Sequence, residues 1–111
     1  MAVIEIVFGV LWALGWFANL YAAGKGTGAY ATRGQLLFTG FLMVGELVWL
    51  LASAPLTWFG WTLAVYFAIW IAIEFFMAGT GGKYFGMAFN IAGIILAPIF
   101  LILLFTVGIV A

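Results

Sequence analysis

Two glutamates lie inside long apolar segments of this chain, and they have the strongest claim to chemistry. Glu46 lies near the middle of segment 35–53, and Glu74 lies toward the end of segment 56–78. A carboxylate at the centre of a membrane helix costs on the order of 3 kcal/mol, whereas each Leu, Ile, Phe or Val contributes roughly −0.3 to −0.6 kcal/mol. Segment 35–53 holds ten such residues. It can therefore insert into a membrane, and we expect Glu46 to face protein or water rather than lipid.

The surroundings of Glu46 leave three alternatives open. Burial disfavours a charged carboxylate, and no cation of this chain lies at the same depth. Glu46 is therefore a neutral, hydrogen-bonded carboxyl, a group paired with a cation of another subunit, or a proton-coupled site. At helical spacing it shares a polar face with Gln35, Thr39 and Ser53. The candidate hydrogen-bond partners of a neutral carboxyl are Asn19, Asn90 and Thr39.

The other two acidic residues have simpler interpretations. Glu74 lies about 7 Å along a helix from the end of its segment, where a basic loop begins. Lys83 or Arg33 can extend toward it, so we expect an ion pair at the membrane interface. Glu5 lies at the outer end of the first apolar segment and is expected to be a solvated end charge.

The composition excludes several classes of protein. The chain has 111 residues, of which 69% are hydrophobic and 5% are charged. A soluble domain has about 25% charged residues, so a water-soluble fold is not expected. Three basic residues without clustering exclude a nucleic-acid surface. Because His, Cys and Asp are absent, we expect no metal site or cofactor and no His-based triad, and the chain is not expected to be an enzyme.

Four apolar segments are long enough to cross a bilayer as helices. The predicted fold is therefore all-α, a polytopic membrane protein with four transmembrane helices arranged as two hairpins in one bundle, forming a single domain. Pro98 lies inside the last segment and should free the carbonyl of Ile94, which gives a kink. The predicted helices cover residues 2–23, 35–53, 56–78 and 86–111.

Small residues recur at helical spacing on three of these segments, where they let another helix backbone approach closely. Four predicted helices have more such faces than they can easily bury against one another. The chain is therefore expected to pack against other membrane subunits or copies of itself. The predicted packing residues are Gly9, Ala13, Ala64, Ala68, Gly86, Gly93 and Ala97.

All three basic residues lie in or beside the two glycine-containing loops, 24–34 and 79–85. By the positive-inside rule these loops are cytoplasmic and both termini lie outside the cell membrane. We expect the basic side chains to contact lipid headgroups. These residues are Lys25, Arg33 and Lys83.

Two families resemble parts of this pattern. The length and the four segments resemble those of small multidrug-resistance transporters, but that family places its glutamate in the middle of the first helix, where this chain has none. The stretch 81–98 resembles conjugative pilins, which pair hydrophobic helices around a short basic glycine loop. The expected function is a non-catalytic integral membrane subunit. The alternatives are a proton- or cation-coupled small transporter using Glu46, and a pilin-like subunit of a filament.

Overall fold

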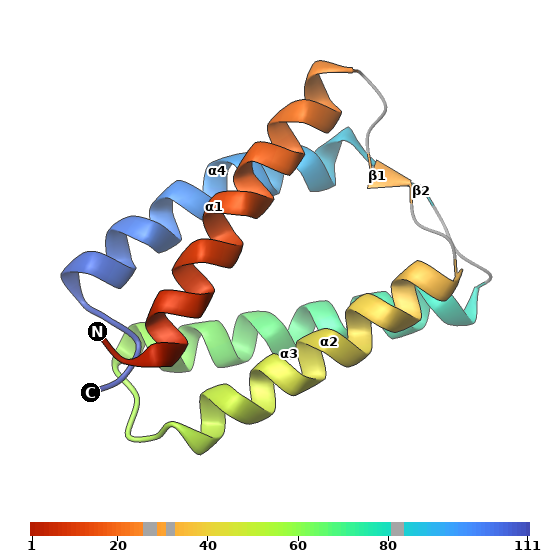
Figure 1. Ribbon diagram of the computed structural model, residues 1–111. Helices are drawn as coiled ribbons and strands as arrows, with labels where there is room; N and C mark the ends of the chain where they lie inside the picture. Colours follow the sequence, from red (N-terminus) through yellow and green to blue (C-terminus); the bar gives the residue numbers. More distant parts are fainter. Residues whose placement is uncertain (26–28, 31–32, 81–83) are drawn as a thin grey trace. The chain divides into compact units, whose positions relative to one another are not determined.

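The computed structural model describes residues 1–25, 29–30, 33–80 and 84–111, and for residues 29–30 and 84–90 it describes the backbone alone. Over these residues the prediction of an all-α chain with four helices is confirmed. Three of the helices, α1, α2 and α3, are long and apolar enough to cross a membrane. The elements are α1 (Val3–Gly24), β1 (Ala29–Tyr30), α2 (Arg33–Ala52), α3 (Trp58–Gly79), β2 (Tyr84–Gly86) and α4 (Met87–Thr106) (Figure 1).

The first three helices begin and end within two residues of the predicted bounds, but α4 ends at Thr106 instead of continuing to residue 111. Gly108 causes this difference. Its φ angle of 79° lies in the left-handed region that glycine adopts without strain. Its N–H donates to the carbonyl of Leu103 over 2.9 Å, a backbone bond that closes the last turn of the helix.

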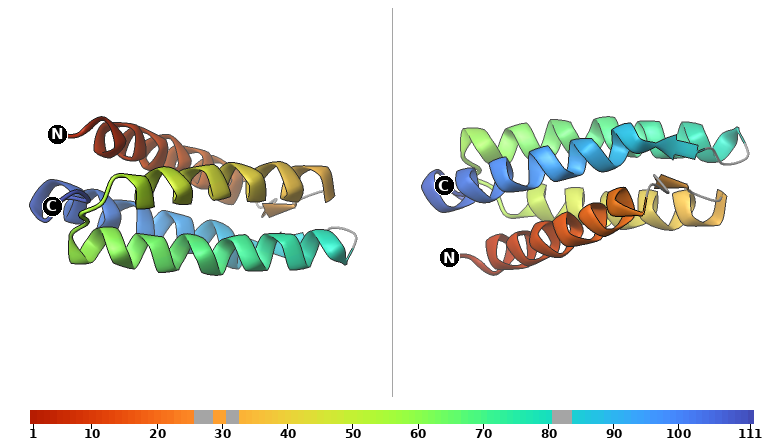
Figure 2. Two further views of the ribbon diagram at one scale, coloured as in Figure 1. Left: turned by 90° about the horizontal axis from the view of Figure 1, so that it is seen from below. Right: turned by 90° about the horizontal axis from the view of Figure 1, so that it is seen from above.

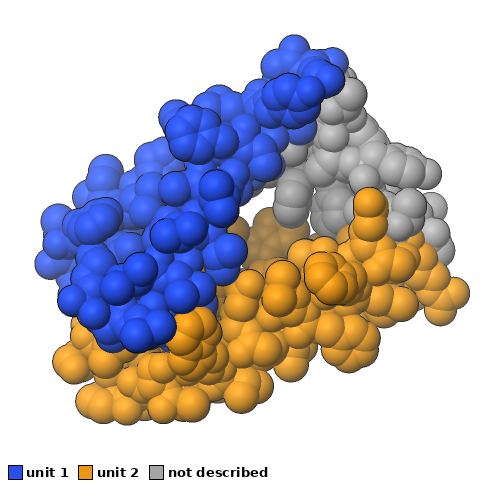
Figure 3. Space-filling model, viewed as in Figure 1, with its two compact units in different colours: residues 1–30, 84–108 blue, residues 31–83, 109–111 orange. Residues whose placement is uncertain are grey.

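The chain divides into two compact units, shown in two colours in Figure 3. The α1–α4 unit contains residues 1–30 and 84–108, and the α2–α3 unit contains residues 31–83 and 109–111. The predicted arrangement of two hairpins in one bundle is not confirmed. The extensive helix packing lies between α1 and α4 and between α2 and α3. Only five residues connect α2 to α3, and so short a link favours antiparallel neighbours.

In the α1–α4 unit, large apolar side chains fill the seam between the two helices. Ile4 and Phe8 of α1 and Leu104 of α4 are buried. The rings of Trp12 and Phe100 meet across the seam with their centroids 5.4 Å apart. β1 pairs antiparallel with β2, which ties the end of α1 to the beginning of α4.

In the α2–α3 unit the two helices run side by side in opposite directions (Figure 2). The two helices pack tightly at Gly40, where an added Cβ would lie 3.0 Å from the ring of Phe75. The ring of Phe41 meets the same Phe75 edge-on at 5.2 Å. A larger residue at position 40 would therefore require the Phe75 ring to move. The buried side chains of this unit include Leu36, Leu50, Phe59, Leu63 and Phe67.

The last residues of the chain pack on the turn between α2 and α3. The Thr57 N–H donates to the carbonyl of Ile109 over 2.9 Å, and the Ala111 N–H donates to the carbonyl of Pro55 over the same distance. Ile109 is fully buried. The hydroxyl oxygen of Thr57 accepts a bond from the Gly60 N–H, so Thr57 is the N-cap of α3. This arrangement explains why α3 begins at Trp58, two residues later than predicted.

Candidate functional site

Glu46 and Glu74 both belong to the α2–α3 unit. Glu74 is buried, with 4% of its surface exposed, and Glu46 is half-buried. The two residues lie on the two helices that pack against each other in this unit. Both residues stand out in the sequence as carboxyls in apolar segments, but their proximity is visible only once α2 is paired with α3.

The register of the two helices explains why the carboxyls are near one another without being in contact. Gly40 faces Phe75, so in an antiparallel pair Glu74 lies level with residue 41 of α2. Glu46 is five residues further along α2, which corresponds to about 7 Å along the helix axis. The two carboxyls are therefore neighbours on the same pair of helices, at slightly different depths.

The oxygen Oε2 of Glu74 is buried and has no hydrogen-bond partner among the described residues. The predicted partners of Glu74 were Lys83, which lies outside the described residues, and Arg33, which is exposed at the start of α2. The ion pair at the membrane interface therefore stays a prediction.

The hydroxyls of the predicted polar face are satisfied within their own helix. Thr39 Oγ1 donates to the carbonyl of Gln35 over 2.7 Å, and Ser53 Oγ donates to that of Trp49 over 2.8 Å. A Ser or Thr in a helix often bonds the carbonyl four residues earlier, which removes its need for an external partner. The Thr39 hydroxyl, expected as a donor to Glu46, is thus already used.

The two asparagines proposed as partners of Glu46 belong to the α1–α4 unit. Asn19 donates from Nδ2 to the carbonyl of Gly15 over 2.9 Å. Its amide lies against Gly93 of α4, where an added Cβ would collide with Nδ2 and would lie 3.0 Å from Cγ. Gly93 is therefore the residue that makes room for Asn19. The side chain of Asn90 lies outside the described residues.

Glu5 is not the solvated end charge that the sequence suggested. Only 8% of its surface is exposed. Its Oε1 accepts the Ala2 N–H over 2.9 Å, which satisfies a free donor at the start of α1. A Cβ on Gly108 would lie 2.9 Å from Oε2, so the turn that ends α4 packs directly on this carboxyl. The expectation was wrong because that turn is distant in sequence.

A hydrogen bond that the sequence analysis missed joins α1 to α4. Pro98 has no N–H, so the Ile94 carbonyl loses its donor within the helix, as predicted. The indole Nε1–H of Trp16 donates to this carbonyl over 3.0 Å. A tryptophan on a neighbouring helix is one of the few side chains of this chain able to donate there. The proline was thus a signal for a polar contact between helices.

We expect Trp16→Phe to lower the free energy of unfolding by about 1 kcal/mol, because the Ile94 carbonyl would lose its donor. In a Pro98→Ala background, residue 98 regains an N–H that can bond Ile94 within α4. Trp16→Phe should then cost less. A double-mutant cycle measured by unfolding in detergent checks this, and equal costs in both backgrounds would contradict the assignment.

The predicted packing residues are distributed over the two units. Gly9 lies opposite Leu104, Ala97 and Ala64 are buried, and Ala68 is exposed on α3. For Gly86 the structure describes the backbone alone, so its packing lies outside the described residues.

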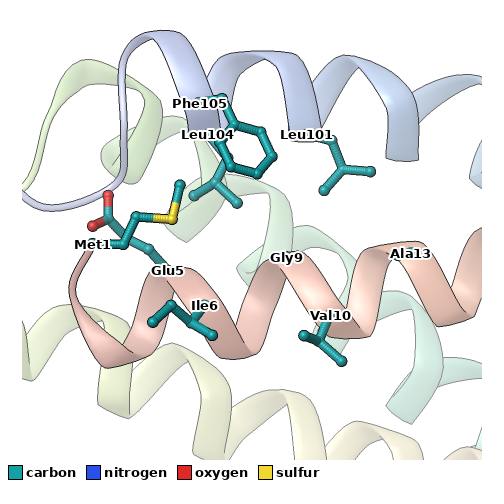
Figure 4. A pocket seen from close by; sticks show the side chains of 9 residues that line it. All are labelled: Met1, Glu5, Ile6, Gly9, Val10, Ala13, Leu101, Leu104 and Phe105. Carbon is teal, nitrogen blue, oxygen red and sulfur yellow. The ribbon is translucent and has the colours of Figure 1, made fainter.

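Gly9 and Ala13 also line an apolar groove of about 420 Å³ between α1 and α4. Figure 4 shows Leu101 and Leu104 extending from α4 toward α1, with Glu5 at the end of the groove where α1 begins.

The basic residues expected at lipid headgroups are described in part. Lys25 is exposed just after α1, with its Nζ 4.6 Å from the centroid of the Tyr21 ring. Arg33 is exposed in the first turn of α2. Lys83 lies outside the described residues.

No known family model matches this chain, and neither a curated protein nor a solved structure is significantly similar to it. Among the described residues, no three side chains of the types that bind metals lie together. Interpretation of the site therefore depends on its geometry.

Proposed function

We propose that this chain is a small, non-catalytic integral membrane subunit that packs through open small-residue helix faces into a larger membrane assembly or a homo-oligomer. Three helices of 20 to 22 residues with a hydropathy of 1.7 to 1.8 support membrane insertion. Large apolar side chains on the helix exteriors support it further, since they would face lipid or a partner. Among the most exposed are Phe38, Phe41, Phe76 and Phe105.

Gly45 carries this proposal. It lies within α2, it is exposed, and apart from the nearby backbone of its own helix no described atom lies within 4 Å of the position that its Cβ would occupy. Gly40, on the other side of the same helix, is filled by Phe75 of α3. In a membrane, small residues of this kind allow close packing between helices. Gly40 therefore has its packing partner within the chain, whereas Gly45 has the geometry to receive a helix of another subunit.

The second open small-residue face is on α3. Ala68 and Ala72 are both exposed and four residues apart, which places them on one side of the helix. A partner backbone can approach such a pair closely. The two helices of the α2–α3 unit therefore each offer a face to a neighbour.

The same proposal includes an orientation. Within the α2–α3 unit, Arg33 and the end of α3 lie at one end, opposite the turn 53–57. Lys25 follows the last turn of α1. With the positive-inside rule, the ends that carry the basic residues are cytoplasmic and both termini lie outside.

We test the assembly by co-purifying tagged and untagged copies, together with any other bound subunit, in a mild detergent. Gly45→Leu fills the open face and should reduce the recovered complex by at least about tenfold, which corresponds to about 1.4 kcal/mol of association energy. Gly24→Leu is the matched control, because Gly24 also has open space around it but lies at the last residue of α1. Equal recovery of the two variants would count against Gly45 as an interface residue.

A further inference from the structure

The carboxyl oxygen Oε2 of Glu74 is buried and has no hydrogen-bond partner among the described residues, so the negative charge of an ionised Glu74 would be uncompensated there. The side chain is 4% exposed, and Oε2 accepts no hydrogen bond from the described residues. Burying an ionised carboxylate without partners costs several kcal/mol, so such a group either meets a cation or is neutral. The Thr39 hydroxyl on α2 is not a donor to Glu74, since it donates to the Gln35 carbonyl of its own helix.

Glu46 adds to this unfavourable electrostatic environment. It lies on the helix packed against that of Glu74, about 7 Å further along the pair, and its ionised form carries the same charge. Two like charges on one pair of apolar helices raise each other's free energy of ionisation, and the effect is larger in an apolar setting than in water. The other titratable groups on the two helices are Arg33, exposed at the start of α2, and Tyr66, which lies about 12 Å along α3 from Glu74 and contacts Trp70.

A proton fits this position better than a metal ion does. Hard cations need several oxygen ligands in a closed shell. Among the described residues no cluster of three acidic, histidine or cysteine side chains exists, and the chain has no His, Cys or Asp at all. A proton, by contrast, needs only the one carboxyl oxygen that is without a partner.

We propose that Glu74 is a proton-binding site buried in the α2–α3 unit, and that its proton occupancy is coupled to the charge on Glu46. With a proton on Glu74, the pair carries one negative charge at most. Glu46 is half-buried and is therefore the more exposed member of the pair. This site is independent of the assembly proposed above, because it depends on contacts within one chain.

Infrared spectroscopy of the whole protein in liposomes tests the proposal directly. A protonated carboxyl has a C=O absorption distinct from those of a carboxylate and of the amide backbone. The chain has only three acidic side chains, Glu5, Glu46 and Glu74, so each can be assigned by subtraction. We expect the band at pH 7 in the wild type and in Glu5→Gln, its loss in Glu74→Gln, and its loss in the wild type at alkaline pH.

Two further measurements test the coupling to Glu46 and distinguish a bound proton from a bound metal cation. In Glu46→Gln the pH range over which the Glu74 band disappears should shift, because the neighbouring charge has been removed. Exchanging choline chloride for sodium chloride should leave the band unchanged. If Glu74→Gln does not insert, ¹³C-labelled glutamate identifies the band as a glutamate carboxyl, and its persistence in the double variant Glu5→Gln/Glu46→Gln assigns it to Glu74.

Three results would overturn the proposal. The first is the absence, at pH 7, of a protonated-carboxyl band that is lost in Glu74→Gln or assigned to Glu74 by the label. An ionised Glu74 would instead fit the predicted ion pair with Lys83 or Arg33. The second is a band that sodium abolishes, which would identify a metal cation as the ligand. The third is a Glu74 band whose pH range is the same with and without Glu46.

Discussion

Replacing Gly60 with alanine is expected to lower the free energy of unfolding by about 2 to 3 kcal/mol. The added Cβ would lie 2.5 Å from the carbonyl oxygen of Ile109 and 2.9 Å from Cβ of Leu56. The first of these is a backbone atom that no side-chain rotation can move. The last residues of the chain must therefore leave the turn between α2 and α3, or α3 must shift.

The loss should extend to the hydrogen bonds of this turn. Ile109 accepts from both the N–H and the hydroxyl of Thr57, over 2.9 and 3.3 Å. We expect amide hydrogen exchange at Thr57 to become faster in Gly60→Ala, alongside a lower midpoint of unfolding in detergent. Gly15→Ala is the control, because no atom lies within 4 Å of its Cβ position and alanine favours a helix by about 1 kcal/mol over glycine. If both variants unfold like the wild type, the packing of the last residues on this turn is wrong.

Gly93→Ala should be the second most damaging exchange, and it should act in the α1–α4 unit. Its Cβ would collide with the amide of Asn19, which is held in place by its bond to the Gly15 carbonyl. Either that bond breaks or α1 moves away from α4, and we expect a cost of about 1 to 3 kcal/mol.

Removing the obstructing side chain provides the control. In Asn19→Ala the space opposite residue 93 is open, so adding Gly93→Ala to it should cost little. Unfolding of the wild type, the two single variants and the double variant measures this coupling. Additive costs would show that Asn19 and Gly93 are not in contact.

The helices could be predicted from the sequence, whereas their pairing could not. Long apolar runs broken by Gly24 and Pro55 are sufficient to locate α1, α2 and α3. These helices are apolar on nearly every face, so no polar stripe indicates which side is buried or which helix lies opposite. The extensive pairing of α1 with α4 therefore could not be derived from periodicity.

The individual site residues were also within reach of the sequence, but their surroundings depended on contacts between distant segments. Glu46 and Glu74 stand out as carboxyls in apolar helices, and Pro98 correctly predicts a carbonyl without its helix donor. That Trp16 supplies the donor, and that Gly108 brings a turn onto Glu5, follows from the packing of α1 on α4. These contacts join residues about 80 to 100 positions apart, where local patterns carry no information.

The mass of the wild-type protein, extracted from its own membranes in a mild detergent and measured by native mass spectrometry, tests the central claim most directly. The proposed membrane subunit predicts a particle whose protein mass exceeds the 12.0 kDa of one chain, as an integer multiple of it or with other subunits bound. A single chain of 12.0 kDa, at every detergent concentration that keeps it folded, would contradict the proposal.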